Sequence, residues 1–270
     1  MKKTIYFISK LIFMLSLLLV ITSVKAQTTD DDFIPHSGQA GKDVVWVPTP
    51  QELVDTMLGM AKVTPADFVI DLGSGDGRTV ITAAKRGATA LGIEYNQDMV
   101  DLSRRAALEE GVSERAKFEK ADLFETDFSK ATVITMFLLT DINLRLRPII
   151  LDMKPGTRIV SNTFDMGEWE PDQTTQLTDL YTGWTTAHLW IVPAKVDGTW
   201  KLDGGQVTIS QNFQNISGTL TMGNDVIKLT GSLNGDKISV KADGMEFIGM
   251  VSGNSISVTN PQGGTWKVTR

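Results

Sequence analysis

The sequence contains no cysteine and only two histidines, His36 and His188, among its 270 residues. Without cysteine the chain cannot carry disulfides, a thiol nucleophile or a thiolate metal site. Two histidines far apart in the sequence leave a transition metal few ligands, so no metal site is expected. A chain of this length can bury a core that needs no cross-links.

Positive charge is also scarce once the first residues are set aside. Residues 1–26 hold four lysines and no acid, whereas the rest of the chain has 22 basic and 32 acidic residues. The acidity belongs to residues 27–193, with 15 basic and 26 acidic residues, because residues 194–270 have seven and six. Nucleic acids and anionic membranes bind through basic surfaces, so neither is an expected partner.

No apolar run is long enough to span a bilayer. The run at residues 11–22 has about a dozen residues, and a spanning helix needs about 20. It follows Met1-Lys2-Lys3 and precedes Val24-Lys25-Ala26, the layout of a secretory signal peptide. An uncleaved anchor is the alternative, which the short run disfavours. We expect residues 1–26 to be removed on export to the periplasm or cell envelope, leaving residues 27–48 as an N-terminal extension and no membrane span.

Residues 49–193 alternate between helical and strand patterns. Thr49-Pro50 begins a predicted helix with a capping residue and a proline in the first turn. Further helices are expected over residues 80–86, 99–110 and 142–153, and strands over residues 68–70, 90–93, 117–119, 132–137 and 158–161. Strands and helices that alternate with short links predict a parallel sheet covered on both faces.

The last 77 residues differ in composition, with 12 of the 24 glycines and one of the nine prolines. Short alternating runs separated by Asn-Gly and Asp-Gly turns are typical of hairpins. Gly198-Thr199-Trp200-Lys201 near the start matches Gly264-Thr265-Trp266-Lys267 near the end. We therefore expect residues 194–270 to form a small antiparallel barrel, with an open meander or sandwich as the alternative.

A glycine-rich loop follows the first predicted strand. Asp71 precedes Gly73, Gly75 and Gly77, and the next residue, Arg78, stands where a dinucleotide-binding loop would have glycine or alanine. Glycines let the backbone approach a ligand closely. A carboxylate at the strand end suits a cationic ligand, such as the ammonium of an amino-acid group, better than a pyrophosphate.

Two further acids follow the next predicted strands. Glu94 ends the second strand, where it can accept hydrogen bonds from a ribose diol. Asp122 lies just past the third strand and can accept from an adenine amino group. The neighbouring Ser74, Tyr95 and Leu123 belong to the same predicted site.

This series of an acid, glycines and two later acids resembles the class I S-adenosylmethionine-dependent methyltransferases. Val47-Pro48-Thr49-Pro50, the loop at residues 71–78, Ala83-Ala84-Lys85-Arg86-Gly87 and Asn143-Leu144-Arg145-Leu146-Arg147-Pro148 look like bacterial relatives of a lysine methyltransferase family. That family includes the mitochondrial enzyme that acts on the c subunit of ATP synthase. The resemblance covers roughly residues 44–193. It implies a Rossmann-like seven-stranded sheet of order 3-2-1-4-5-7-6.

The same resemblance implies S-adenosyl-L-methionine as cofactor. Carried over by motif position, Asp71 and the three loop glycines hold its methionine part, Glu94 its ribose and Asp122 its adenine. The cofactor would lie at the carboxyl ends of the strands, as ligands of open α/β sheets do.

The methyl acceptor is less defined by the sequence. Enzymes that methylate base amines or glutamine commonly carry Asn-Pro-Pro-Tyr after the fourth strand, where this chain has Phe137-Leu138-Leu139-Thr140-Asp141. An apolar rim at residues 137–139 can line a channel for a lysine stem, with Asp141 or Asp165 as the catalytic group near the amine. Alternatively, residues 137–139 are core and Asp141 caps the following helix.

The sequence therefore predicts an exported S-adenosylmethionine-dependent methyltransferase that N-methylates a protein lysine. A binding or scaffold protein that holds an adenosyl ligand without turnover is one alternative, and a methyltransferase with a small-molecule acceptor is another. Retention of the whole acid and glycine series favours an enzyme over a binding protein.

Overall fold

The computed structural model describes residues 33–178, 183–260 and 263–270. The predicted signal peptide and residues 27–32 of the extension lie outside the described residues. Residues 35–270 form one compact unit. Within the described part of the chain, no helix is long and apolar enough to cross a membrane.

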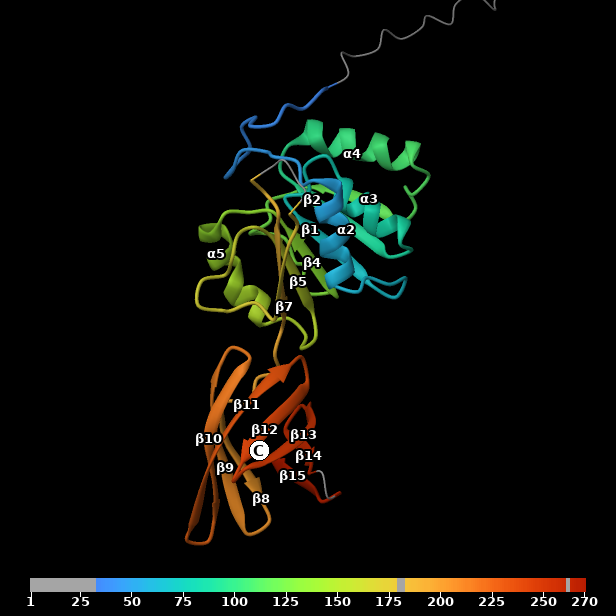
Figure 1. The fold of residues 1–270 in the computed structure, drawn as a ribbon. Coiled ribbons are helices and arrows are strands. Elements are labelled where there is room, and N and C mark those ends of the chain that lie inside the picture. Colours follow the sequence, from blue (N-terminus) through green and yellow to red (C-terminus); the bar gives the residue numbers. More distant parts are fainter. Residues whose placement is uncertain (1–32, 179–182, 261–262) are drawn as a thin grey trace, which may run out of the picture. The chain divides into compact units, whose positions relative to one another are not determined.

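Seven strands form one sheet at the centre of the first half of the chain (Figure 1). Its order is β3 (Ala116–Lys120), β2 (Thr89–Glu94), β1 (Phe68–Leu72), β4 (Val133–Met136), β5 (Arg158–Asn162), β7 (Thr186–Ile191) and β6 (Gln173–Gln176). The strand order implied by the family resemblance is thus confirmed.

One strand of the sheet, β7, runs in the opposite direction to the others. β7 runs antiparallel to both β5 and β6, whereas the other neighbours are parallel. A parallel return needs a crossover connection, usually helical, and the described residues between β5 and β7 form no helix. β6 was not predicted because its residues, Gln-Thr-Thr-Gln, show no apolar alternation, and it lies at the sheet edge.

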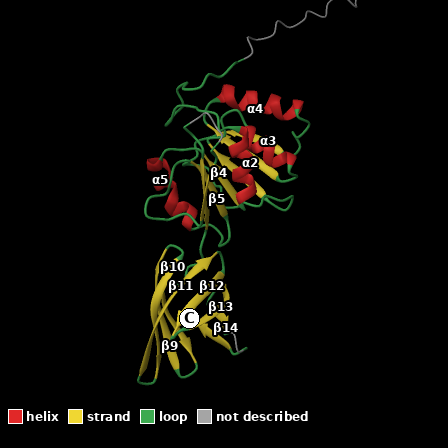
Figure 2. Cartoon of the chain, in the orientation of Figure 1, coloured by secondary structure: helices red, strands yellow, loops and turns green. Residues whose placement is uncertain are grey.

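Helices cover both faces of the sheet (Figure 2). α2 (Gln51–Met60), α3 (Arg78–Lys85) and α4 (Gln97–Glu109) share one apolar core with strand residues such as Val69. α5 (Thr140–Leu151) lies on the opposite face and shares a second core with Ile70 and Leu72, which alternate with the first-core residues along β1. Successive strand residues point to opposite faces, so β1, β2, β4, β5 and β7 contribute to both cores. This arrangement leaves the carboxyl ends of the strands open at one edge.

The last part of the chain is a closed barrel of eight antiparallel strands, as predicted. Its strands are β8 (Gly198–Leu202), β9 (Gly205–Asn212), β10 (Asn215–Met222), β11 (Asp225–Asn234), β12 (Lys237–Ala242), β13 (Met245–Ser252), β14 (Ser255–Thr259) and β15 (Thr265–Thr269). The first and last strands close it through the pair Lys201 and Thr269. Closure removes exposed strand edges and rules out the open sandwich.

The sheet ends at Ile191 and the barrel begins at Gly198, near the predicted boundary at residue 193. The two parts also touch, because the ring of Phe213 stacks on Trp169 with centroids 5.9 Å apart. The division of the chain into domains at residues 49–193 and 194–270 stays a prediction.

Candidate functional site

The glycine loop between β1 and α3 is shaped by backbone geometry that side chains disfavour. Gly73, Gly75 and Gly77 have φ angles of +76°, +52° and +80°. A Cβ added at Gly75 would lie 2.4 Å from Trp46 Nε1, and one at Gly77 would lie 2.7 Å from the Phe118 ring. Each glycine is therefore required by its conformation, and these two also by the space around them.

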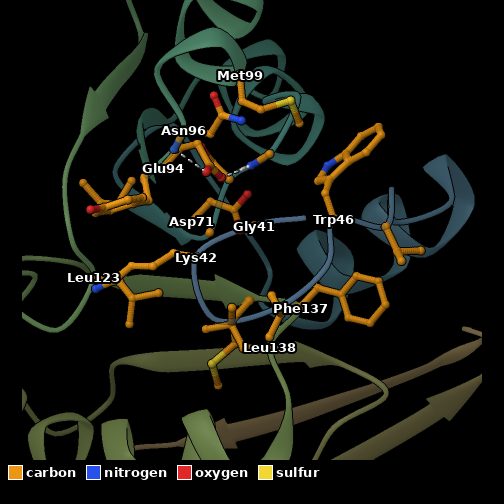
Figure 3. A pocket seen from close by; sticks show the side chains of 18 of the residues that line it. Gly41, Lys42, Trp46, Asp71, Glu94, Asn96, Met99, Leu123, Phe137 and Leu138 are labelled. Carbon is orange, nitrogen blue, oxygen red and sulfur yellow. Dashed lines mark hydrogen bonds between the residues drawn. The ribbon is translucent and has the colours of Figure 1, made fainter. Parts of the chain in front are cut away.

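One cavity at the carboxyl ends of the strands gathers the predicted cofactor residues (Figure 3). Its lining includes the predicted residues Asp71, Gly73, Ser74, Gly75, Glu94, Tyr95, Asp122 and Leu123. Gly77 lies outside this lining and serves packing against Phe118 and Ser103. Strand order explains the convergence, because the acids end the neighbouring strands β1 and β2 or follow β3.

Glu94 holds two parts of the cavity wall. One carboxylate oxygen accepts from Gly75 N and the other from Asn96 N, both at 2.9 Å. A carboxylate has about four acceptor positions, so each oxygen keeps capacity for another donor. Glu94 can thus order the glycine loop and still accept hydrogen bonds from a ribose diol.

Asp71 is buried at the end of β1. Thr135 Oγ1, from the paired residue on β4, donates to its carboxylate at 2.6 Å. Burial raises the pKa of Asp71 to about 7, the charges of Asp76 and Glu94 act in the same direction, and the Thr135 hydrogen bond opposes them. A cationic ligand would therefore stabilise the ionised carboxylate. Sequence reasoning missed Thr135, although a hydroxyl in an otherwise apolar strand is a usable signal.

The N-terminal segment at residues 39–49 lines the cavity and crosses its mouth (Figure 3). Trp46 N donates to Gln39 O at 2.9 Å, which closes a small loop in the segment. Within that loop, Lys42 forms an ion pair with Asp122, and its Nζ lies 5.0 Å from the centroid of the Tyr95 ring. The hydrogen bond from Lys42 lowers the pKa of Asp122. No local sequence pattern indicates the contact of Lys42 with Asp122.

The residues around the cavity show whether it fits a cofactor. Asp71 can pair with a cationic group, and each carboxylate oxygen of Glu94 keeps acceptor capacity for a diol. At Gly75 the backbone itself borders the cavity, because an added Cβ would lie 2.4 Å from Trp46 Nε1. These groups match a polar cofactor that carries a cationic group and a diol. The Ser74 hydroxyl packs instead against Gly92, where an added Cβ would lie 2.5 Å from its Oγ.

The two predicted catalytic acids are both exposed, and neither lines the cavity. Asp141 lies in the first turn of α5, and because the N-cap is Leu139 the capping alternative is wrong. Asp165 accepts from Gly167 N at 3.2 Å and from Thr140 Oγ1 at 3.4 Å. Their catalytic role stays a prediction.

The apolar rim at residues 137–139 was expected either to line a lysine channel or to belong to the core, and its three residues differ in this respect. Phe137 and Leu138 line the cavity, and Leu138 is also 3% exposed within the second core. Leu139 is 46% exposed and does not belong to that core. Only the first two residues of the rim can therefore border the cofactor.

A strained turn follows β5. Thr163 has φ +62°, and Phe164 N donates to Asn162 O at 2.7 Å, which makes a tight three-residue turn. A β-branched residue at positive φ costs about 1–3 kcal/mol, so neighbours must hold it in place. Ser161 Oγ and Asn143 Nδ2 both donate to Phe164 O, and Thr163 N donates to Thr186 O. Asn162 Nδ2 donates to Thr49 Oγ1. His188 Nε2 lies within hydrogen-bond distance of Thr163 O.

Comparison with known proteins gives an independent view of this site. The family model described as ANTKMT methyltransferase domain matches residues 71–173, a range that contains Asp71, Glu94 and Asp122 and ends before the barrel. A protein-lysine N-methyltransferase of Saccharolobus islandicus (strain REY15A) is 42% identical over 150 residues, covering 54% of this chain and 89% of that protein.

Two further similarities cover the same half of the chain. A lysine N-methyltransferase of Homo sapiens, named for the C subunit of ATP synthase, is 34% identical over 131 residues; the match covers 48% of this chain and 56% of that protein. A solved structure described as an RNA methyltransferase from Salinibacter ruber in complex with S-adenosyl-L-homocysteine is 45% identical, with a TM-score of 0.52. This likeness covers 56% of this chain and 96% of that one.

Proposed function

The chain belongs to the S-adenosylmethionine-dependent methyltransferases, and from that premise we propose that it methylates the side-chain amine of a lysine in a protein. S-adenosylmethionine is its cofactor. The observation that carries the proposal is the convergence of Asp71, Glu94 and Asp122 on one cavity beside the glycine loop.

A lysine acceptor is favoured by the relatives and by charge. The archaeal and human relatives are both described as lysine N-methyltransferases. The Salinibacter protein is described as acting on RNA, but residues 27–193 of this chain hold 26 acidic and 15 basic residues. Such a surface repels a polyanion and attracts a basic segment of a protein. The absence of Asn-Pro-Pro-Tyr after β4 points the same way.

The reaction requires a neutral amine and an ordered cofactor. When bound, S-adenosylmethionine would supply an electrophilic methyl group on its sulfonium, and transfer of that group from sulfur to the lysine nitrogen would release S-adenosylhomocysteine. The lysine must lose a proton before the attack, because its cation has no lone pair. Phe137 and Leu138 can exclude water and thereby lower the lysine pKa.

The polar residues have separate tasks in this proposal. Asp71 would pair with the amino-acid ammonium of the cofactor, Glu94 would accept from its ribose, and Asp122 would accept from its adenine. Asp141 and Asp165 are exposed carboxylates that can orient the lysine amine and receive its proton. Positioning supplies most of the catalysis in such a site.

Export to the periplasm or cell envelope is part of the proposal and rests on residues 1–26 alone. Mass spectrometry of the chain purified from fractionated cells tests it. A mature terminus at Gln27 in the envelope fraction supports export, and an intact Met1 terminus in the cytoplasm contradicts it.

The test of function is incubation of the full chain with methyl-labelled S-adenosylmethionine and an extract of protein and RNA from the same cells. Hydrolysis and chromatography then identify the labelled residue. Methyl-lysine from the protein fraction supports the proposal, with Glu94→Ala, which should bind the cofactor more weakly, as the control at low cofactor concentration. Label on RNA or on a small molecule contradicts it, and cofactor binding without any labelled product would favour the binding-protein alternative.

A further inference from the structure

Three aromatic side chains from three separate loops meet beside the cofactor cavity. Phe137 follows β4, Phe164 follows β5, and Trp184 precedes β7. Their ring centroids lie 6.0 Å apart for Phe137 and Phe164, 5.4 Å for Phe137 and Trp184, and 5.8 Å for Phe164 and Trp184. All three side chains are half-buried. Because Phe137 also lines the cavity, this aromatic cluster extends the cavity wall outward.

The position of the aromatic cluster in the sheet separates it from the cofactor acids. The acids stand at the ends of β1, β2 and β3, on one side of the sheet edge. The residues of the aromatic cluster adjoin the ends of β4, β5 and β7, which follow β1 in the sheet order on the side away from β2 and β3. β7 is antiparallel, so its first residues lie at the same edge as the last residues of β5, with Ala187 paired to Asn162. An acceptor that approaches the methionine end of the cofactor therefore enters over the cluster.

The backbone holds Phe164 in this cluster at a cost in strain. Thr163 has φ +62°, and the tight turn that it makes directs the chain at Phe164. Asn143 and Ser161 both donate to Phe164 O, at 3.2 and 2.7 Å. Backbone strain held by surrounding contacts is concentrated at ligand-binding positions. In this molecule the strained turn at Thr163 fixes the position of Phe164 in the aromatic cluster.

The chemistry of the aromatic cluster suits a cation on an aliphatic stem. Aromatic faces carry negative electrostatic potential and attract ammonium groups, while their large apolar area packs against methylene groups. The exposed residue Asp165 follows Phe164 directly in the chain and adds a negative charge to this segment. We propose that Phe137, Phe164 and Trp184 form the acceptor site, which binds the lysine side chain as its ammonium before the proton is lost and places its nitrogen at the methionine end of the cavity.

This inference rests on the proposed function, but it is tested first by binding rather than by turnover. The probes are N-acetyl-lysine methylamide and N-acetyl-norleucine methylamide, which share the aliphatic stem but differ in the amine. Saturation-transfer NMR on the full chain should show the lysine probe bound about fivefold to thirtyfold more tightly. Trp184→Leu and Phe164→Leu should abolish that preference, and Trp184→Phe should retain it.

A matched control comes from the barrel, where Trp266 is 40% exposed and lies 5.3 Å from the Phe247 ring. Trp266→Leu should leave the preference for the lysine probe unchanged. With a protein acceptor, Trp184→Leu should raise KM by a similar factor, affect kcat less and leave cofactor affinity unchanged. These results together would support the acceptor site.

Two results would overturn it. Equal affinity of the wild-type chain for both probes would show that the aromatic cluster does not recognise the amine. A parallel loss of cofactor affinity and thermal stability in Trp184→Leu and Trp184→Phe would show that the cluster only supports the loops. If the wild-type chain methylates no lysine, the proposed function fails separately, while the two probes still decide whether the cluster binds an ammonium.

Discussion

The burial of Asp71 predicts that cofactor affinity falls as the pH drops below 7. Its pKa is raised to about 7, mainly because the carboxylate is buried. A cofactor that carries an ammonium binds the ionised form, so a protonated Asp71 must release its proton on binding. Folding raises this pKa from 3.8, so in the ligand-free chain the contribution of Asp71 to stability is full below about pH 4. That contribution is lost as the pH rises through about 7.

The size of the effect follows from the fraction of Asp71 that is ionised. With a pKa of about 7, roughly half is ionised at pH 7 and roughly a tenth at pH 6, which predicts about a fivefold loss of affinity. Binding at pH 6 should release about 0.9 proton. The α-amino group of the cofactor titrates near 7.7–8.0, so this range avoids it.

Isothermal calorimetry in two buffers of different ionisation enthalpy measures both the affinity and the released proton. Asp71→Asn should flatten the pH dependence and weaken binding at pH 7. Thr135→Val removes the hydroxyl that donates to Asp71 at 2.6 Å, so it should move the midpoint to higher pH. A pH-independent affinity, or binding without proton release at pH 6, would refute the role given to Asp71.

Three further predictions concern other parts of the site. Glu94→Ala should weaken cofactor binding by about tenfold to a hundredfold, because it removes a charged hydrogen-bond acceptor; unchanged affinity in calorimetry would dismiss the ribose assignment. A chain truncated after Val192 should still bind cofactor in the same assay, because no described barrel residue lines the cavity, and its aggregation would show instead that the barrel covers apolar surface of the first part. Asp141→Asn and Asp165→Asn should keep cofactor affinity while one of them lowers lysine methylation; wild-type rates from both would remove these residues from the mechanism.

The cofactor site was largely predictable because its parts follow local patterns. Gly73, Gly75 and Gly77 form a loop that other residues disfavour, directly after an apolar strand. Glu94 and Asp122 likewise follow strands that their apolar residues reveal. Parallel strands present their carboxyl ends at one edge, so placing an acid at the end of a strand was enough to place it at the site.

The residues proposed to bind the methyl acceptor were less predictable from the sequence, because their contacts join segments that are distant in the chain. Asp141 and Asp165 were chosen for charge and sequence position, yet neither lines the cavity. Trp184 joins Phe137 only because β7 returns antiparallel beside β5, and no local pattern gives that direction.

By itself, the sequence determined the alternation of strands and helices, the antiparallel hairpins of the last part and the series of candidate cofactor residues, since side-chain periodicity and turn chemistry act over a few residues. The tertiary structure alone decided that Lys42 pairs with Asp122, that Thr135 donates to Asp71, and that a strained turn at Thr163 completes the aromatic cluster. The physical reason is that these contacts depend on which strands are neighbours and on how close their side chains come, and both are settled only when the whole sheet packs.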